Sequence, residues 1–508
     1  MRFRNVSTVP LHLGLFSLAA TVAQANERRS LAVPETMAQA SVTRSSSADW
    51  QPVMTGRLKN GVRFAILPRR GDEPGIGVLM RNEGGFIEEH RPGERGLTHL
   101  IEHLVFTSPT IDAPDELRHF PKVGLPLTFP APSAATTSWR ESNYFVSTRT
   151  TRMTDLDTLL GLFREVATDL TFRADAVDDQ RADVTREMGE KTLGNDIYAR
   201  YIAAVAPGSP TDVIDAQNSD DVPTASIATI RALYQRLYQP ENMMIVIVGN
   251  VDPVKTKALI REHFGSWRHA GQATAHVAVP AFQSDRIAPI SVAALPQGRR
   301  TALMTVVMPT ALPLPTRGQH IDAMLLEMLV LRAVNTRLSA MQPDSPPGKV
   351  GLYIENGEQG HRLIMLWDNF AGDAWHPAIA GLARVRCALD SGGFSDQEWD
   401  AAQRALIQDL DRRTSAMGQV QNVELAKDLS HAFAAGRALI PPSALLRRAQ
   451  TRLPAIDAQA GNYWWRQQWR AGVRHVRVES PDLAPMAGDG SAIRTSIAEA
   501  SKTGCNGL

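Results

Sequence analysis

Two histidines and a glutamate within five residues carry the clearest chemistry of the sequence. His99 and His103 stand four positions apart, so on a helix both imidazoles leave the same face and can bind one metal ion. Glu102 lies near that face and can accept a proton from water without binding the metal itself. The order His-x-x-Glu-His is the reverse of the commoner His-Glu-x-x-His motif of zinc peptidases. The pattern predicts a hydrolytic zinc site with Glu102 as the base.

A catalytic zinc site needs a third protein ligand and an open position for water. The predicted helix that contains Gln180 offers Glu187 and, one turn later, Glu190. Many glutamates on helices are only solvated, and spacing does not decide between these two. Either carboxylate could complete the site.

The elements that must position these side chains follow from hydrophobic patterns. Apolar runs predict strands, an apolar residue every three or four positions predicts helices, and the order of strands before helices favours an α+β fold. We expect strands at 62–67, 76–80, 144–148 and 243–249, and helices at 96–106, 153–170, 176–193, 227–238 and 253–264. A Pro-rich loop should span residues 108–132.

The same succession of elements recurs after a linker at residues 269–289. Strands are expected at 303–308, 350–354 and 363–366, and helices at 319–341, 375–390 and 395–413. The recurrence predicts two related domains, each a mainly antiparallel sheet packed against helices. The first, 54–268, would bind zinc, and the second, 290–508, would lack a metal site.

Length and composition set further bounds. A chain of 508 residues is too long for one hydrophobic core, and its 54 basic and 53 acidic side chains leave no net charge that would hold nucleic acid. Cys387 and Cys505 are too few for a disulfide scaffold or a thiolate zinc site. They could form one bridge in an oxidising compartment.

The N-terminus resembles a secretion signal. Two arginines precede an apolar run from Val9 to Ala25 that ends in Ala-Gln-Ala, which predicts a cleaved signal peptide over residues 1–25. The alternative is a membrane anchor, but the run is short for a span of about 20 residues. A loose leader rich in Ser, Ala and Thr should follow over residues 26–53. We expect export to the periplasm without a stable membrane span.

The stretch Gly96-Leu-Thr-His-Leu-Ile-Glu-His-Leu-Val-Phe106 resembles the pitrilysin/insulinase family of inverted zincins, which includes the mitochondrial processing peptidase. Residues 58–62, 238–243, 248–252 and 264–267 resemble further motifs of the first domain in that family. The resemblance implies two halves of two domains each, which close like a clam around unfolded peptides. It also implies one zinc ion per chain, with Glu187 as the third ligand.

The chain departs from the family pattern at three places. Gln180 stands where the family has a glutamate that supports the site, and Ala134-Ala135-Thr136-Thr137-Ser138 replaces Asn-Ala-x-Thr-Ser, which engages the substrate backbone. No arginine stands seven residues before Tyr353, where active members place an Arg and Tyr pair. The resemblance therefore implies a secreted zinc endopeptidase that works as a heterodimer, its partner a second two-domain chain that supplies this pair. The alternative is an inactive member that acts as a binding or scaffolding subunit.

Overall fold

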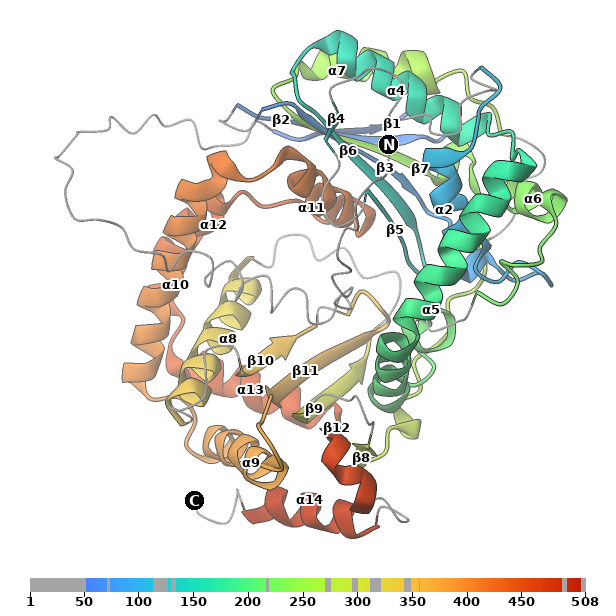
Figure 1. Ribbon diagram of the computed structural model, residues 1–508. Helices are drawn as coiled ribbons and strands as arrows, with labels where there is room; N and C mark the ends of the chain where they lie inside the picture. Colours follow the sequence, from blue (N-terminus) through green and yellow to red (C-terminus); the bar gives the residue numbers. More distant parts are fainter. Residues whose placement is uncertain are drawn as a thin grey trace, which may run out of the picture.

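The computed structural model describes residues 52–70, 74–112, 127–128, 134–215, 219–269, 276–294, 300–310, 321–341, 349–355, 357–486 and 491–503. Side chains are described in these ranges except at 127–128, 190–198, 215, 341, 484–486, 492–493, 501 and 503. The expected signal peptide, most of the leader and most of the Pro-rich loop lie outside the described residues. Two sheets and their helices make up the fold, which confirms the expected α+β class (Figure 1).

The first sheet has seven strands in the order β1-β2-β7-β3-β6-β4, with β5 paired to β6. Its strands are β1 (Met54–Arg57), β2 (Arg63–Pro68), β3 (Ile76–Asn82), β4 (Leu127–Thr128), β5 (Ala135–Thr137), β6 (Ser142–Thr148) and β7 (Met243–Gly249). All seven residues of β7 are buried, because a continuous apolar run suits a strand that is covered on both faces.

Five helices belong to the same part of the chain. They are α2 (Leu97–Thr107), α4 (Met153–Thr168), α5 (Ala174–Val205), α6 (Ile227–Leu237) and α7 (Pro253–Phe264). They cover one face of the first sheet, where alternate strand residues such as Phe64, Val78 and Val146 form a single apolar core with the helices. The turn before β2 has Gly61 at φ +105°, and Asn60 donates hydrogen bonds to the carbonyls of Phe264 and Trp267. The hairpin is thereby fixed to the end of α7.

The second sheet has five strands in the order β10-β11-β9-β12-β8. They are β8 (Ile290–Ala293), β9 (Thr301–Pro309), β10 (Val350–Ile354), β11 (His361–Asp368) and β12 (Val473–Glu479). The helices of this part are α8 (Ile321–Met341), α9 (Trp375–Ser391), α10 (Asp396–Ala416), α11 (Asn422–Ala434), α12 (Pro442–Arg452), α13 (Ala458–Ala471) and α14 (Ser491–Thr503).

The two sheets repeat one pattern of strand directions. In the first, β2 is parallel to β7, and β3, β6 and β5 follow antiparallel. In the second, β8 is parallel to β12, and β9, β11 and β10 follow antiparallel. In this alignment α8 takes the place of α2, and its sequence contains no histidine. The repeat agrees with the expectation of two related units.

One helix of each unit packs against the sheet of the other unit. The far face of the first sheet packs against α11 through residues such as Leu67, Phe145 and Leu429. The end of α5 packs in return on the second sheet, where Ile202 and Val205 meet Leu363. Figure 1 shows α5 extending from the first unit to the second, and α11 lying beneath the first sheet. This contact explains why α5 runs beyond residue 193, the end that the sequence pattern predicts.

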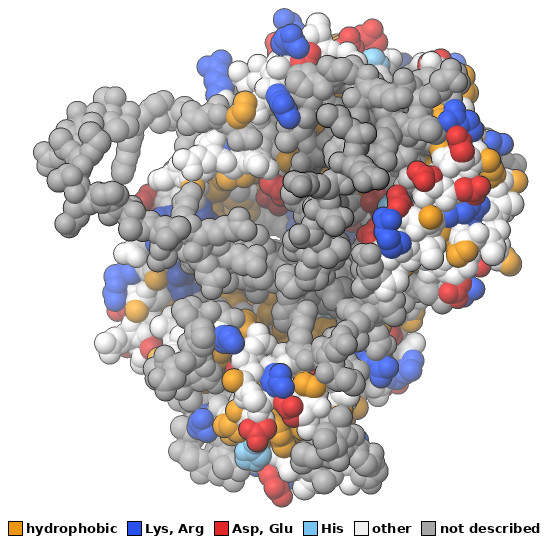
Figure 2. Space-filling view, in the orientation of Figure 1, with side chains coloured by type: hydrophobic (Ala, Val, Ile, Leu, Met, Phe, Trp, Pro, Cys, Tyr) orange, Lys and Arg blue, Asp and Glu red, His pale blue; other side chains and the backbone are white. Residues whose placement is uncertain are grey.

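Two smaller observations concern the surface and the cysteines. Among the described residues no helix is both long and apolar enough to cross a membrane. Basic and acidic side chains intermingle on the described part of the face in Figure 2.

Cys387, on the buried side of α9, is disulfide-bonded, and Cys505 lies outside the described residues.

Candidate metal centre

Helix α2 divides into a buried and a functional face. Leu97, Leu100, Ile101 and Leu104 are buried in the core of the first unit, at the three- and four-residue spacing that fixes one side of a helix inward. The two histidines of the motif then leave the opposite side, where their rings meet edge to face with centroids 5.0 Å apart. The sequence therefore predicts both this helix and the shared face of its two histidines correctly.

The start of α2 is held by a buried glutamate that no periodic sequence pattern indicates. Gly96, at φ +85°, precedes the helix and offers no side-chain cap. The buried carboxylate of Glu89 accepts hydrogen bonds from the backbone N–H groups of Gly96 and Thr98, at 2.8 and 2.7 Å, and from the Thr98 hydroxyl. It thus satisfies N–H groups that a helix start leaves unpaired. Burial is the largest influence on this carboxyl group and raises the pKa of Glu89 to about 7.

Helix α5 brings the third acidic residue to the histidines. Val177 and Val184 are buried in the core, and Gln180 and Glu187 lie at three- and four-residue spacing from them on the same side of α5, which therefore faces α2. A Glu187 carboxylate oxygen lies 3.4 Å from Nε2 of His103 and 3.8 Å from Nε2 of His99. One ligand atom from each of the three residues lies within 4.8 Å of the others. The side chain of Glu190 lies outside the described part of α5.

This donor set fits a zinc ion. Bonds of about 2.0–2.1 Å in tetrahedral geometry place neighbouring ligand atoms about 3.3 Å apart, close to the two distances involving Glu187. Two imidazoles and one carboxylate are also a ligand set of catalytic zinc sites, which leaves the fourth position for water. The side chains of His99, His103 and Glu187 are 12%, 22% and 32% exposed, so all three are partly accessible to solvent among the described residues.

Gln180 fixes the orientation of His103. Its Oε1 lies 3.1 Å from Nδ1 of His103, and Gln180 itself is only 6% exposed. Because an amide oxygen can only accept, Nδ1 must carry the proton, and the lone pair of Nε2 is then directed to the metal position. The supporting role predicted for residue 180 therefore corresponds to a hydrogen bond to His103, and the acceptor is a neutral amide oxygen.

Glu102 has a hydrogen-bond partner on the neighbouring strand. The hydroxyl of Thr137, in β5, donates to Oε2 of Glu102 at 2.6 Å. The hydroxyls of Tyr144 and Tyr238 form a buried pair nearby. Burial first, and then neighbouring groups that include the Glu102 carboxylate, raise the pKa of both tyrosines. Both tyrosines therefore stay protonated, and neither was identified from the sequence.

The other predicted site residues fall in two places. Ala135 begins β5, the strand that carries Thr137, and the carbonyl of Ala134, just before the strand, accepts the N–H of Phe145. Tyr353, in β10, packs instead against the cluster formed by the end of α5 and the second sheet. Burial raises the pKa of Tyr353.

The sequence matches two family descriptions. Residues 84–196 match insulinase, peptidase family M16, and residues 224–332 match the peptidase M16 inactive domain. The probable zinc protease PqqL of Escherichia coli is 29% identical over 216 residues, which cover 42% of this chain and 23% of PqqL. The zinc protease PqqE of Helicobacter pylori is 27% identical over 215 residues, 42% of this chain and 46% of that protein. The matched segments are thus less than half of each relative.

Solved structures agree over most of the chain. The first half of the periplasmic protease PqqL from Escherichia coli superposes with a TM-score of 0.75 at 19% identity, over 89% of this chain and 97% of that half. The complete PqqL gives a TM-score of 0.74 at 21% identity, over 89% of this chain and 50% of PqqL. The structure described as a predicted insulinase family protease from Yersinia pestis gives a TM-score of 0.69 at 18% identity, over 92% of this chain and all of that chain. The fold is therefore that of one half of such a protease, and the chain belongs to the insulinase family, peptidase family M16.

Proposed function

We propose that the chain is a zinc metalloendopeptidase in which His99, His103 and Glu187 hold one zinc ion and Glu102 is the general base. The observation that carries the proposal is the convergence of these three ligands from α2 and α5, with Glu102 beside them on α2. The names of the relatives PqqL and PqqE as zinc proteases support the same chemistry.

Each side chain has a distinct task in peptide hydrolysis. A bound zinc ion would lower the pKa of water and polarise a peptide carbonyl. Glu102 accepts the proton of the attacking water and can deliver it to the leaving amine. Thr137 holds the Glu102 carboxylate in place, and Gln180 holds the His103 ring. We place the substrate backbone along β5, beside Ala134 and Ala135.

We further propose that this half works with a second half of similar fold. The proposal is supported by the fold match to 50% of the complete PqqL and to nearly all of its first half. The Arg and Tyr pair of active members is incomplete here, since no arginine stands seven residues before Tyr353, and Tyr353 itself packs beside the end of α5. A preorganised donor at the reacting carbonyl is commonly worth about a hundredfold or more in rate. The partner would supply this donor, and the substrate would be an unfolded peptide enclosed between the halves.

The proposed compartment is the periplasm. The signal-like N-terminus supports export, and the relative PqqL is described as a periplasmic protease. A bridge that uses Cys387 suits an oxidising compartment.

Zinc analysis and peptide cleavage test the proposal together. Purified chain should hold one zinc ion, and a quenched fluorescent peptide should be cleaved slowly by the chain alone and at least about a hundredfold faster with a partner half. Chelation should stop cleavage, and added zinc should restore it. A zinc-loaded chain that cleaves no peptide, with or without a two-domain family partner encoded beside it, would favour the binding or scaffolding alternative.

A further inference from the structure

We propose that a buried ion cluster centred on Arg81 and Glu141 positions the turn that presents Thr137 to Glu102. Arg81 and Glu141 would therefore be positioning residues for the catalytic base, although neither touches the metal ligands. The inference deepens the proposed peptidase function and rests on it for the role of Glu102.

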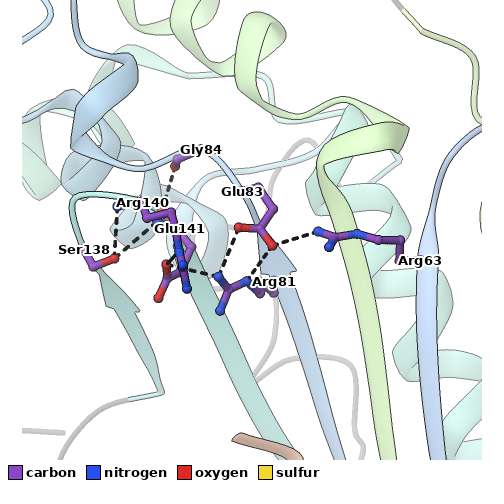
Figure 3. A network of polar contacts seen from close by, with 8 residues as sticks. Arg63, Arg81, Glu83, Gly84, Ser138, Arg140 and Glu141 are labelled. Atoms are coloured by element: carbon purple, nitrogen blue, oxygen red, sulfur yellow. Dashed lines mark hydrogen bonds and ion pairs between the residues drawn. The ribbon is translucent and has the colours of Figure 1, made fainter. Parts of the chain in front are cut away.

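The cluster is shown in Figure 3. Arg81, at the end of β3, has a fully buried side chain that donates to Glu83 at 2.9 and 3.0 Å and to Glu141 at 3.2 Å. Arg140 donates to the same oxygen of Glu141 at 3.0 Å, and Arg63 donates to Glu83 at 2.8 Å. Three guanidinium groups thus share two carboxylates. Removal of one partner from such a buried arrangement leaves an uncompensated charge, so the cluster holds its members in fixed relative positions.

Glu141 belongs to the tight turn between β5 and β6. The Ser138 hydroxyl oxygen accepts the backbone N–H groups of Arg140 and Glu141, both at 3.2 Å, and the Ser138 N–H donates to the Glu141 carbonyl at 2.8 Å. These bonds close residues 138–141 into one unit. An ion pair that fixes the Glu141 side chain therefore also fixes the backbone of Ser138.

A second segment clamps the turn from the other side. The N–H groups of Phe86 and Ile87 donate to the carbonyls of Ser138 and Trp139 at 3.1 and 2.9 Å. The approach depends on Gly85, where a Cβ atom would lie 2.3 Å from the Ser138 carbonyl oxygen. Since Glu83 is only three residues before Phe86, the ion cluster fixes both the turn and the segment that clamps it.

Thr137 immediately precedes this unit. Its hydroxyl lies 2.6 Å from Glu102 Oε2 and 3.2 Å from Ser142 Oγ, and Ser142 donates to the carbonyl of Gly84. The path from the cluster to the base is therefore Arg81, Glu141, the Ser138 turn, Thr137 and Glu102. Each step is a hydrogen bond, an ion pair or one peptide bond. The account predicts that loosening the turn disturbs Glu102 and leaves zinc binding unchanged.

The first test is amide hydrogen exchange measured by mass spectrometry on the full chain with zinc bound. In Glu141→Gln the segments 85–88 and 137–142 should exchange at least about tenfold faster, since their hydrogen bonds depend on the turn. Zinc stoichiometry and exchange in β11 should stay as in the wild type. Ser138→Ala, which removes the acceptor inside the turn without touching a charge, should give the same local change if Glu141→Gln does not fold.

Glu398→Gln is the matched control. It breaks the Arg337–Glu398 ion pair of 2.6 Å in the second unit and should leave exchange in 85–88 and 137–142 unchanged. Unchanged exchange in both Glu141→Gln and Ser138→Ala would overturn the inference.

The second test measures coupling to the base through activity. Glu141→Gln should lower kcat by about tenfold with KM within twofold, and should cause little further loss in a Thr137→Val background. A purely structural role would give the same loss in both backgrounds, and that result would overturn the inference. If the zinc-loaded wild type cleaves no peptide, the proposed function fails, whereas the exchange result still decides whether the cluster positions the turn.

Discussion

Replacement of Gln180 probes the contact that orients His103. Two substitutions should shift zinc affinity in opposite directions. Gln180→Leu removes the acceptor of the His103 Nδ1–H group, and Gln180→Glu replaces a neutral acceptor with a charged one at the same place. Gln180 is 6% exposed and its Oε1 lies 3.1 Å from Nδ1, so the change acts directly on a ligand.

The magnitudes follow from the geometry. An unpaired N–H group costs about 1–3 kcal/mol when buried, and the 22% exposure of His103 lets water replace part of the lost bond. We therefore expect a loss of about 1–2 kcal/mol in Gln180→Leu, which weakens zinc binding by about 5- to 30-fold. A charged acceptor gives a hydrogen bond about 1 kcal/mol stronger than a neutral one, so Gln180→Glu should bind zinc about fivefold more tightly.

Competition with a zinc chelator of known affinity measures both changes at pH 7. Asp179→Asn is the matched control, because Asp179 is an exposed neighbour on α5 and should leave zinc affinity unchanged. Circular dichroism on each variant checks that the helix is retained. Zinc affinity within twofold of the wild type in both Gln180→Leu and Gln180→Glu would refute the assignment of Gln180 as the partner that orients His103.

Two further predictions concern stability. Burial alone would raise the pKa of Glu83, but Arg81 and Arg63 outweigh it and hold the pKa at about 2, below the ordinary 4.5. Its carboxylate therefore contributes about 3 kcal/mol above pH 4.5 that is lost as the pH falls towards 2, and urea unfolding at a series of pH values should show a shallower acid slope in Glu83→Gln. An unchanged slope would contradict this. Arg69→Met should lower the free energy of unfolding by about 2–3 kcal/mol, because the Arg69 guanidinium donates to the carbonyls of Met417 and Val420 and to Asn422 and so fastens α11 to the first unit. Urea unfolding within 0.5 kcal/mol of the wild type, roughly the spread of neutral substitutions, would show that these bonds add nothing.

The α2 part of the metal centre could be predicted because its residues lie close together in the sequence. His99, Glu102 and His103 lie on one helical turn, and their spacing alone gives the shared face. The position of Glu187 could not be derived in this way, since it follows His103 by 84 residues and only packing of α5 on α2 brings it near. The resemblance to the family selected Glu187 over Glu190, and the geometry brings Glu187 to the histidines.

Contacts between distant segments explain what the sequence did not reveal. Nothing in the pattern of residues 422–434 indicates that α11 covers the first sheet, because an amphipathic helix does not specify its partner. Glu89 had no periodic signal either, since it acts through hydrogen bonds to Gly96 and Thr98 at the start of α2. Thr137 lies in the segment that the resemblance singled out, but its hydrogen bond to Glu102 depends on how β5 packs beside α2. A glutamate seven residues before the glycine that starts the helix motif is the local sign of the cap.

Zinc content and peptide cleavage of Glu102→Gln, compared with the wild type and with Glu187→Ala, test the central claim most directly. The account predicts that Glu102→Gln keeps one zinc ion per chain and loses hydrolysis by at least about a hundredfold, because the base is removed and the ligands remain. Glu187→Ala should lose the metal as well. Cleavage by Glu102→Gln at the wild-type rate, or full zinc content in Glu187→Ala, would contradict the account.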